Sequence, residues 1–143
     1  MTKIDFYLLD DNGLADDGTG KSRFACRLTQ KVFSQGYKIF IYADDQSLIS
    51  KMDNLLWTFQ PGSFLPHGIN ENKTTEPIVL GDAEPPETIH DVLINLASTS
   101  PDFFSSFDRV AEIVGSSESE KLGARERYRF YRDRGYELET HHI

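Results

Sequence analysis

Two kinds of apolar pattern alternate along the first half of the chain. Residues 3–9 are a short run of aromatic and branched side chains, and residues 38–43 are almost continuously apolar, as in strands covered on both faces of a parallel sheet. Residues 21–35, and the segment that Asp44 or Asp45 begins, carry apolar side chains every three or four positions, which predicts helices. This order of strand, helix, strand and helix predicts an α/β fold with a parallel sheet.

The second half contains further strand and helix candidates. Residues 58–86 hold five of the six prolines and three glycines, so most of this stretch is expected to be an ordered loop. A short helix is predicted around residues 102–107, and a longer one from Ser116 or Ser117 to about Arg134. The strand candidates are residues 78–80, 92–96 and 110–114.

Length and composition indicate one folded domain, residues 1–143. The chain is 38% hydrophobic and 12% aromatic, which is too apolar for a disordered protein, and it lacks the long uncharged run of a membrane helix. Its start shows no secretory signal pattern, and Cys26, the single cysteine, has no partner for an internal disulfide. We therefore expect a cytoplasmic protein with no membrane association.

Charge is distributed unevenly along the chain. The net charge is -8, which argues against a broad nucleic-acid surface because phosphate neutralisation needs Lys and Arg. Residues 121–134, however, hold six basic and two acidic side chains. Single-stranded DNA could bind this segment with stacking from Tyr128, Phe130 or Tyr131, but the acidic body disfavours strong direct DNA binding.

One motif suggests nucleotide chemistry. Gly18 to Ser22 (GTGKS) is similar to the end of a phosphate-binding P-loop, where Lys21 and Ser22 would hold phosphate and magnesium. Asp44 and Asp45 could serve as a magnesium-holding pair. Position 15 lacks the expected glycine, two aspartates precede the motif, and Asp45 or Asp44 can simply cap a helix. A small P-loop-like nucleotide-binding phosphohydrolase therefore stays as the alternative function.

Other catalytic and metal patterns are missing from the sequence. The four histidines do not lie at metal-ligand spacings with Cys26 or with one another, so no metal is expected. Neither a GxSxG nor an HExxH motif is present. Cys26 falls in an amphipathic helix and is expected to be a small buried or half-buried side chain. We predict no cofactor and no catalytic site.

Large aromatic side chains gather in and beside the loop that follows the second helix. Trp57 and Phe64 lie close to Pro and Gly, where exposed aromatic side chains are candidate anchors for protein contacts. The alternative, that both rings cover the edge of the sheet, stays equally open from the residues alone.

The final helix has a cationic face. Lys121, Arg125 and Arg129 recur at four-residue spacing, and apolar side chains lie beside them. Such a socket suits an acidic peptide with a C-terminal carboxylate and a hydrophobic last residue, because Arg forms bidentate bonds to carboxylate. A solvated basic face and a phosphate-binding surface are alternatives. The residues of the socket would be Val114, Lys121, Leu122, Arg125, Tyr128 and Arg129.

Several blocks of the chain together resemble the chi subunit of bacterial DNA polymerase III. They occur in the family's order and span nearly the whole chain. The blocks are Phe6 to Asp10 (FYLLD), Leu56 and Trp57, Ser63 to His67 (SFLPH), Val92 to Leu96 (VLINL) and Ala124 to Leu138.

The resemblance implies a single-domain, three-layer Rossmann-like α/β fold with a mostly parallel central sheet flanked by helices. It also implies a non-enzymatic adaptor of the clamp loader that binds the psi subunit as a heterodimer and, separately, the C-terminal tail of single-stranded DNA-binding protein. By position, the socket residues of the final helix match the family's tail-binding site. The psi-facing surface would comprise Trp57, Phe64, Leu65 and Pro66.

Overall fold

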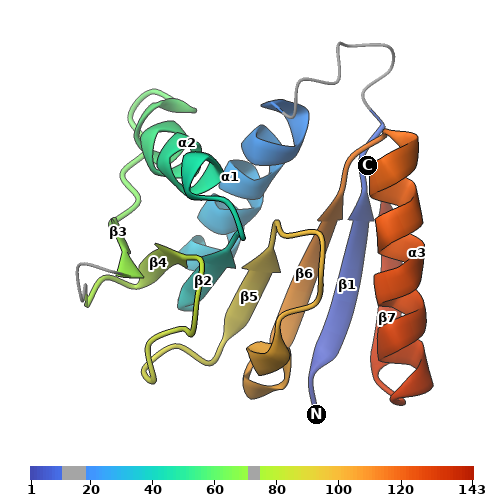
Figure 1. The fold of residues 1–143 in the computed structure, drawn as a ribbon. Helices are drawn as coiled ribbons and strands as arrows, with labels where there is room; N and C mark the ends of the chain where they lie inside the picture. Colours follow the sequence, from blue (N-terminus) through green and yellow to red (C-terminus); the bar gives the residue numbers. More distant parts are fainter. Residues whose placement is uncertain (11–18, 71–74) are drawn as a thin grey trace.

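A computed structural model describes residues 1–10, 19–70 and 75–143 (Figure 1). At its centre, seven parallel strands form one sheet in the order β3-β4-β2-β5-β6-β1-β7. The strands are β1 (Lys3–Leu8), β2 (Ile39–Tyr42), β3 (His67–Ile69), β4 (Ile78–Gly81), β5 (Val92–Asn95), β6 (Arg109–Val114) and β7 (Glu137–His142). The helices are α1 (Thr19–Ser34), α2 (Gln46–Thr58), α3 (Glu118–Asp133) and the short 3₁₀ helix η2 (Asp102–Ser106). The predicted α/β fold is confirmed.

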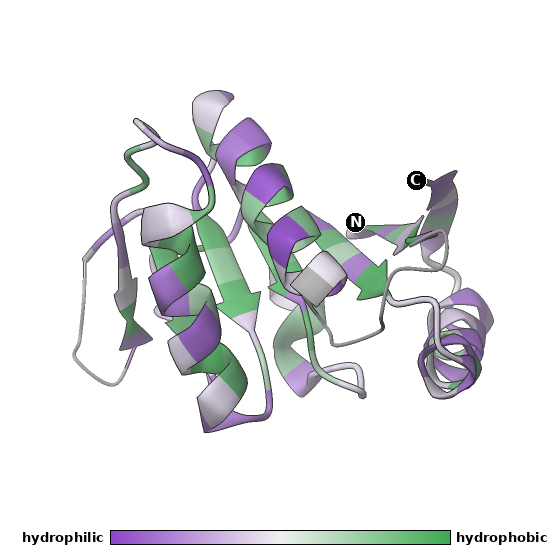
Figure 2. Ribbon diagram, turned by 90° about the horizontal axis from the view of Figure 1, so that it is seen from above, coloured by the Kyte–Doolittle hydropathy of each residue, from purple (hydrophilic) through white to green (hydrophobic). Residues whose placement is uncertain are grey.

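Helices cover both faces of the sheet, which makes three layers (Figure 1). Alternate residues of β2 show the division: Ile39 and Ile41 pack with α1 and α2, whereas Phe40 packs in the core beneath α3 and η2. Figure 2 shows central strands that are mainly hydrophobic, a hydrophilic strand next to the C-terminus, and helices that carry both hydrophobic and hydrophilic residues. The continuous apolar runs of the sequence are therefore strands buried on both faces.

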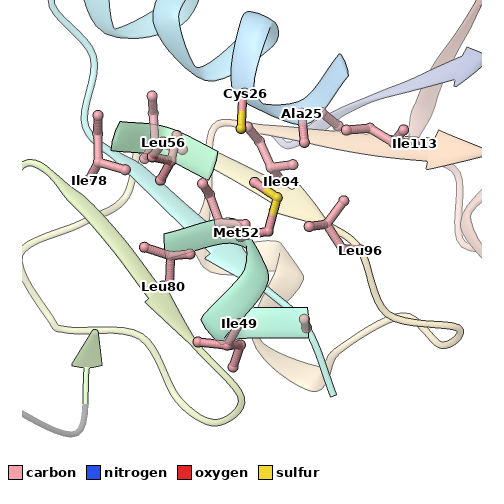
Figure 3. Close-up of a cluster of buried hydrophobic side chains, with 14 of the residues drawn as sticks. Ala25, Cys26, Ile49, Met52, Leu56, Ile78, Leu80, Ile94, Leu96 and Ile113 are labelled. Atoms are coloured by element: carbon pink, nitrogen blue, oxygen red, sulfur yellow. The ribbon is translucent and has the colours of Figure 1, made fainter. Parts of the chain in front are cut away.

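The α2 side of the sheet holds the larger core cluster (Figure 3). Met52 and Leu56 of α2 and Cys26 of α1 meet the strands there and are fully buried. Cys26 has no exposed surface, which confirms the expected burial, and this burial raises the pKa of its thiol to about 12. None of the helices in the described part of the chain combines the length and apolar composition that a membrane span requires.

Polar side chains cap the starts of α2 and α3, and a glycine follows the end of α3, as the sequence predicts. A carboxylate oxygen of Asp45 accepts a hydrogen bond from the backbone N–H of Ser47 at 2.9 Å, which caps α2. The same oxygen accepts from the Ser47 hydroxyl at 2.8 Å, and this bond, together with the backbone bond, lowers the pKa of Asp45. The hydroxyl of Ser117 accepts from the N–H of Glu120 at 3.2 Å and caps α3. Gly135 follows α3 with a φ of 81°, a conformation that favours glycine.

Both edge strands were missed by the sequence prediction. Residues 58–86 are not all loop, because His67–Ile69 form β3 and pair with β4. Regular secondary structure also continues after α3, because Glu137–His142 form β7, which pairs with β1 along six residues. The helix predicted around residues 102–107 is of the 3₁₀ type.

Candidate partner-binding surfaces

A hollow of about 240 Å³ lies between α3, the end of β6 and β1. Four residues of the predicted socket line it: Val114 from β6, and Lys121, Arg125 and Tyr128 from α3. These side chains converge because β6 leads directly into α3, which runs back along the sheet (Figure 1). The other lining residues are Phe6, Leu8, Leu9, Gly115, Ala124 and Thr140.

The hollow combines an apolar floor with a cationic rim. The ring of Tyr128 meets Phe6 edge to face, with 5.4 Å between the ring centroids, which orients the tyrosine over β1. Lys121 and Arg125 are exposed, and within the described residues neither side chain forms an ion pair. Both cations are therefore available to an anionic group whose apolar part fills the hollow.

Two predicted socket residues lie outside this hollow. Leu122 is 56% exposed and does not line it, although it is the residue that follows Lys121. Arg129 is exposed on α3 next to Tyr128 and is likewise absent from the lining. The structure thus brings four of the six predicted residues together and leaves these two on the surrounding surface.

Beneath this surface, α3 is tied to the sheet by a buried polar network that the sequence analysis did not anticipate. Arg127 donates from Nε to a carboxylate oxygen of Glu112 at 2.9 Å, and from Nη1 to the carbonyl of Ser98 at 2.9 Å. The other carboxylate oxygen of Glu112 accepts from the Tyr131 hydroxyl at 2.6 Å and from Asn95 at 2.9 Å. Every hydrogen-bonding side chain of this network is buried.

The network determines which side of α3 faces solvent. Because Arg127 and Tyr131 point into the protein, Lys121, Arg125 and Tyr128 are left on the outer side. Of the three rings that the DNA-binding alternative offers for stacking, Tyr131 is fully buried and cannot meet a base, whereas Tyr128 is partly exposed. One face of the Phe130 ring is covered, since the Arg134 guanidinium lies 3.7 Å from the ring centroid.

A second surface lies around the end of α2 and the chain that leads into β3. Trp57 is 51% exposed and Phe64 is 83% exposed, so both aromatic side chains are free to meet another protein. Pro66 is half-buried beside them. Leu65 differs, because its side chain belongs to the hydrophobic core and does not reach the surface.

The P-loop-like residues are only partly arranged for phosphate. Lys21, Ser22 and Asp45 line a hollow of about 330 Å³, but Glu120 lines it too. Lys21 is already bonded to Glu120 at 2.9 Å, and Asp45 caps α2. Asp44 is exposed, and Gly18 lies in residues 11–18, outside the described part of the chain.

A third polar cluster covers the sheet face of β1 and β7 opposite α3. Asp5 accepts from Arg109 at 2.6 Å and lies 3.0 Å from Nε2 of His141, while Lys3 bonds Glu139 at 2.7 Å. The bond between Lys3 and Glu139 raises the pKa of the lysine and lowers that of the glutamate. Asp5, Glu139 and His141 are close enough to hold a metal ion, a grouping that their sequence spacing did not reveal. Both carboxylates already have cationic partners.

Comparison with known proteins identifies the family. Residues 1–139 match the family model of the DNA polymerase III chi subunit, HolC. The chain belongs to this chi family. The DNA polymerase III subunit chi of Pseudomonas aeruginosa is 36% identical over 143 residues, covering 100% of this chain and 98% of the relative. The chi subunit of Escherichia coli K12 is 29% identical, covering 98% of this chain and 97% of its own. The resemblance seen in the sequence is confirmed, and the chi family supports an accessory role in DNA replication.

A likeness among solved structures extends to the fold alone. The crystal structure of T4 UvsW superposes with a TM-score of 0.70 at 10% sequence identity. The match covers 99% of this chain but 41% of the UvsW chain. The chi-family fold thus corresponds to less than half of that protein, and no activity is transferred from it.

Proposed function

We propose that this protein is a non-catalytic adaptor of the DNA polymerase III clamp-loader complex. In this role it binds the psi subunit through the surface around Trp57 and Phe64, and through psi it joins the clamp loader. It binds the acidic C-terminal tail of single-stranded DNA-binding protein in the hollow beside α3. Membership of the chi family and the composition of the two surfaces support this proposal. Its place of action would be the cytoplasm.

The hollow beside α3 is the observation that carries the tail-binding role. Its volume of about 240 Å³ is below the roughly 300 to 1,000 Å³ of most small-molecule sites, and suits one large side chain better than a cofactor. A terminal carboxylate would meet Arg125, and a hydrophobic last residue would lie on Val114 and Tyr128. Lys121 and the more distant Arg129 would attract the acidic residues that precede it.

Titration with a synthetic acidic peptide that ends in an aromatic residue tests this role. Arg125→Ala should weaken binding at least tenfold, or by about 1.4 kcal/mol, because the carboxylate loses its bidentate partner. Arg132→Ala is the matched control, since Arg132 is exposed on the same helix but does not line the hollow. Equal affinity of the Arg125 and Arg132 variants would exclude this site.

The psi-facing role is supported by exposed aromatic side chains. Trp57 and Phe64 are large, apolar and accessible, which is the usual character of energetic anchors in protein interfaces. Because Leu65 is buried, its contribution to this surface would be to hold the backbone of its neighbours. Contact with psi would then involve the two aromatic rings and Pro66.

Nucleotide hydrolysis is less well supported. A P-loop lysine must be available to phosphates, but Lys21 is paired with Glu120. Because Glu120 and Asp45 both line the hollow, their two carboxylates make it less favourable for an anion. Phosphate binding would require Lys21 to leave Glu120, whereas the adaptor role leaves this ion pair intact.

A further inference from the structure

The exposed Trp57 rests on a buried histidine. The ring centroids of Trp57 and His67 are 4.4 Å apart, with 47° between the ring planes. His67 is the first residue of β3, and its side chain has no exposed surface. One side of the indole therefore packs against an enclosed imidazole, while about half of Trp57 is accessible to a partner.

Each nitrogen of the His67 ring faces oxygen atoms that only accept hydrogen bonds. Nδ1 lies 2.6 Å from the carbonyl oxygen of Leu65. Nε2 lies 3.2 Å from the carbonyl oxygen of Asp53 and 3.2 Å from its carboxylate. A neutral imidazole donates from one nitrogen and accepts at the other, so it would direct a lone pair at one of these oxygens. Only the doubly protonated ring donates on both sides.

We propose that His67, in its doubly protonated form, is the positioning residue that holds Trp57 ready for partner binding, and that pH regulates this surface through it. The inference rests on the proposed role of Trp57 in binding psi. An imidazolium attracts the indole face through a cation–π interaction, which the neutral ring lacks. Partner binding should therefore be stronger at low pH and should weaken as the ring loses a proton.

Protonation of His67 also affects the backbone next to the second exposed aromatic side chain, Phe64. The carbonyl of Leu65, which accepts from Nδ1, belongs to the residue directly after Phe64. Loss of a ring proton would remove either the hydrogen bond to the carbonyl of Leu65 or the one to the carbonyl of Asp53 within α2. His67 thus connects both halves of the surface that Trp57 and Phe64 form.

The charged surroundings of His67 are simple. From α2, the carboxylate of Asp53 is the ionisable group within ion-pair distance, 3.2 Å from Nε2. From β4, the residue paired with His67 is Ile78, which is apolar. From the chain before β3, the contact is the carbonyl of Leu65. Within the described residues, no cation forms an ion pair with Asp53 and competes for it.

Two measurements on the unmodified protein test the inference without any partner. Nitrogen NMR of the His67 ring at pH 6 should show protons on both nitrogens, and a neutral tautomer would overturn the proposal. The pH is then raised until the ring signals show deprotonation. Trp57 is the single tryptophan of the sequence, so indole emission reports on this surface alone. Because a protonated imidazole in contact quenches indole emission, emission should rise in step, and constant emission would contradict the contact.

Psi binding measured over the same pH range tests the regulation. Affinity should fall as His67 deprotonates, whereas His67→Gln should show no such fall. His90→Gln is the control, because His90 is exposed and near η2, and it should keep the pH dependence of the unmodified protein. Constant affinity through the deprotonation of His67 would refute the regulation. If psi does not bind at any pH, the proposed function fails while the ring measurements still decide the protonation state.

Discussion

Arg127 of α3 and Glu112 of β6 form an ion pair of 2.9 Å in the interior of the protein. Burial raises the pKa of Glu112, while the charge of Arg127 and the hydrogen bond from Tyr131 oppose that rise. Such a pair adds little net stability over apolar residues, but breaking it leaves a charge in a medium that solvates it poorly. The pair therefore acts mainly to hold α3, and with it the tail-binding hollow, in one orientation.

We expect Arg127→Ala to destabilise the fold by about 3 to 5 kcal/mol, because Glu112 would lose its buried counter-charge. Urea denaturation followed by circular dichroism measures the change. Arg129→Ala is the matched control: it removes the same charge from the exposed side of α3 and should change stability by less than about 0.5 kcal/mol. Similar midpoints for the two variants would show that the pair does not hold the helix.

Substitutions in the surface around Trp57 should distinguish residues needed for binding from residues needed for folding. Trp57→Ala and Phe64→Ala should leave a folded protein that no longer co-purifies with psi, because both side chains are largely exposed. Leu65→Ala should instead destabilise the fold by about 2 to 5 kcal/mol, since it opens a cavity in the core. Unfolding of the Trp57 or Phe64 variants would identify those rings as core residues, against their exposure.

Cys26 should be unreactive in the folded protein. With a pKa of about 12, only about one molecule in ten thousand carries the thiolate at pH 8, and the thiolate is the reactive form. A thiol reagent at pH 8 should therefore modify the protein slowly under native conditions and rapidly in urea. Equally fast modification in both conditions would mean that the middle of α1, where Cys26 lies, opens readily in the folded protein.

Nucleotide binding provides a test of the alternative function. Titration of the protein with ATP and magnesium should give no saturable signal, because Glu120 already neutralises Lys21. Saturable binding that Lys21→Ala abolishes and Lys51→Ala preserves would revive the phosphohydrolase. Lys51 is a suitable control, since it lines the same hollow without belonging to the GTGKS motif.

Elements with a local signal were predicted well. The apolar runs of β2 and β5 and the helical spacing of α1 and α2 predict those elements, because burial on both faces or on one stripe leaves a periodic pattern. Asp45 and Ser117 likewise mark helix starts through contacts with residues two or three positions away. The cationic spacing of Lys121 and Arg125 pointed to the surface that contains the hollow.

Features that depend on distant partners were not predicted. In β7 only Leu138 packs against the core, and its charged residues are stabilised by Lys3 and Asp5 from the other end of the chain. β3 is three residues long, too short to leave a pattern. In the sequence, Arg127 resembles the other cations of a basic helix, and no neighbouring residue indicates that it forms a buried ion pair with Glu112.

By itself, the sequence determined the α/β class, the family and the position of the basic helix, because periodicity and ordered motifs are written in neighbouring residues. Only the tertiary structure decided which cations of that helix face a partner and which face the core. It also placed His67 beneath Trp57, with oxygen acceptors on both sides of its ring. Such relationships depend on how strands and helices are juxtaposed, and the packing that brings distant residues together leaves no spacing signal along the chain.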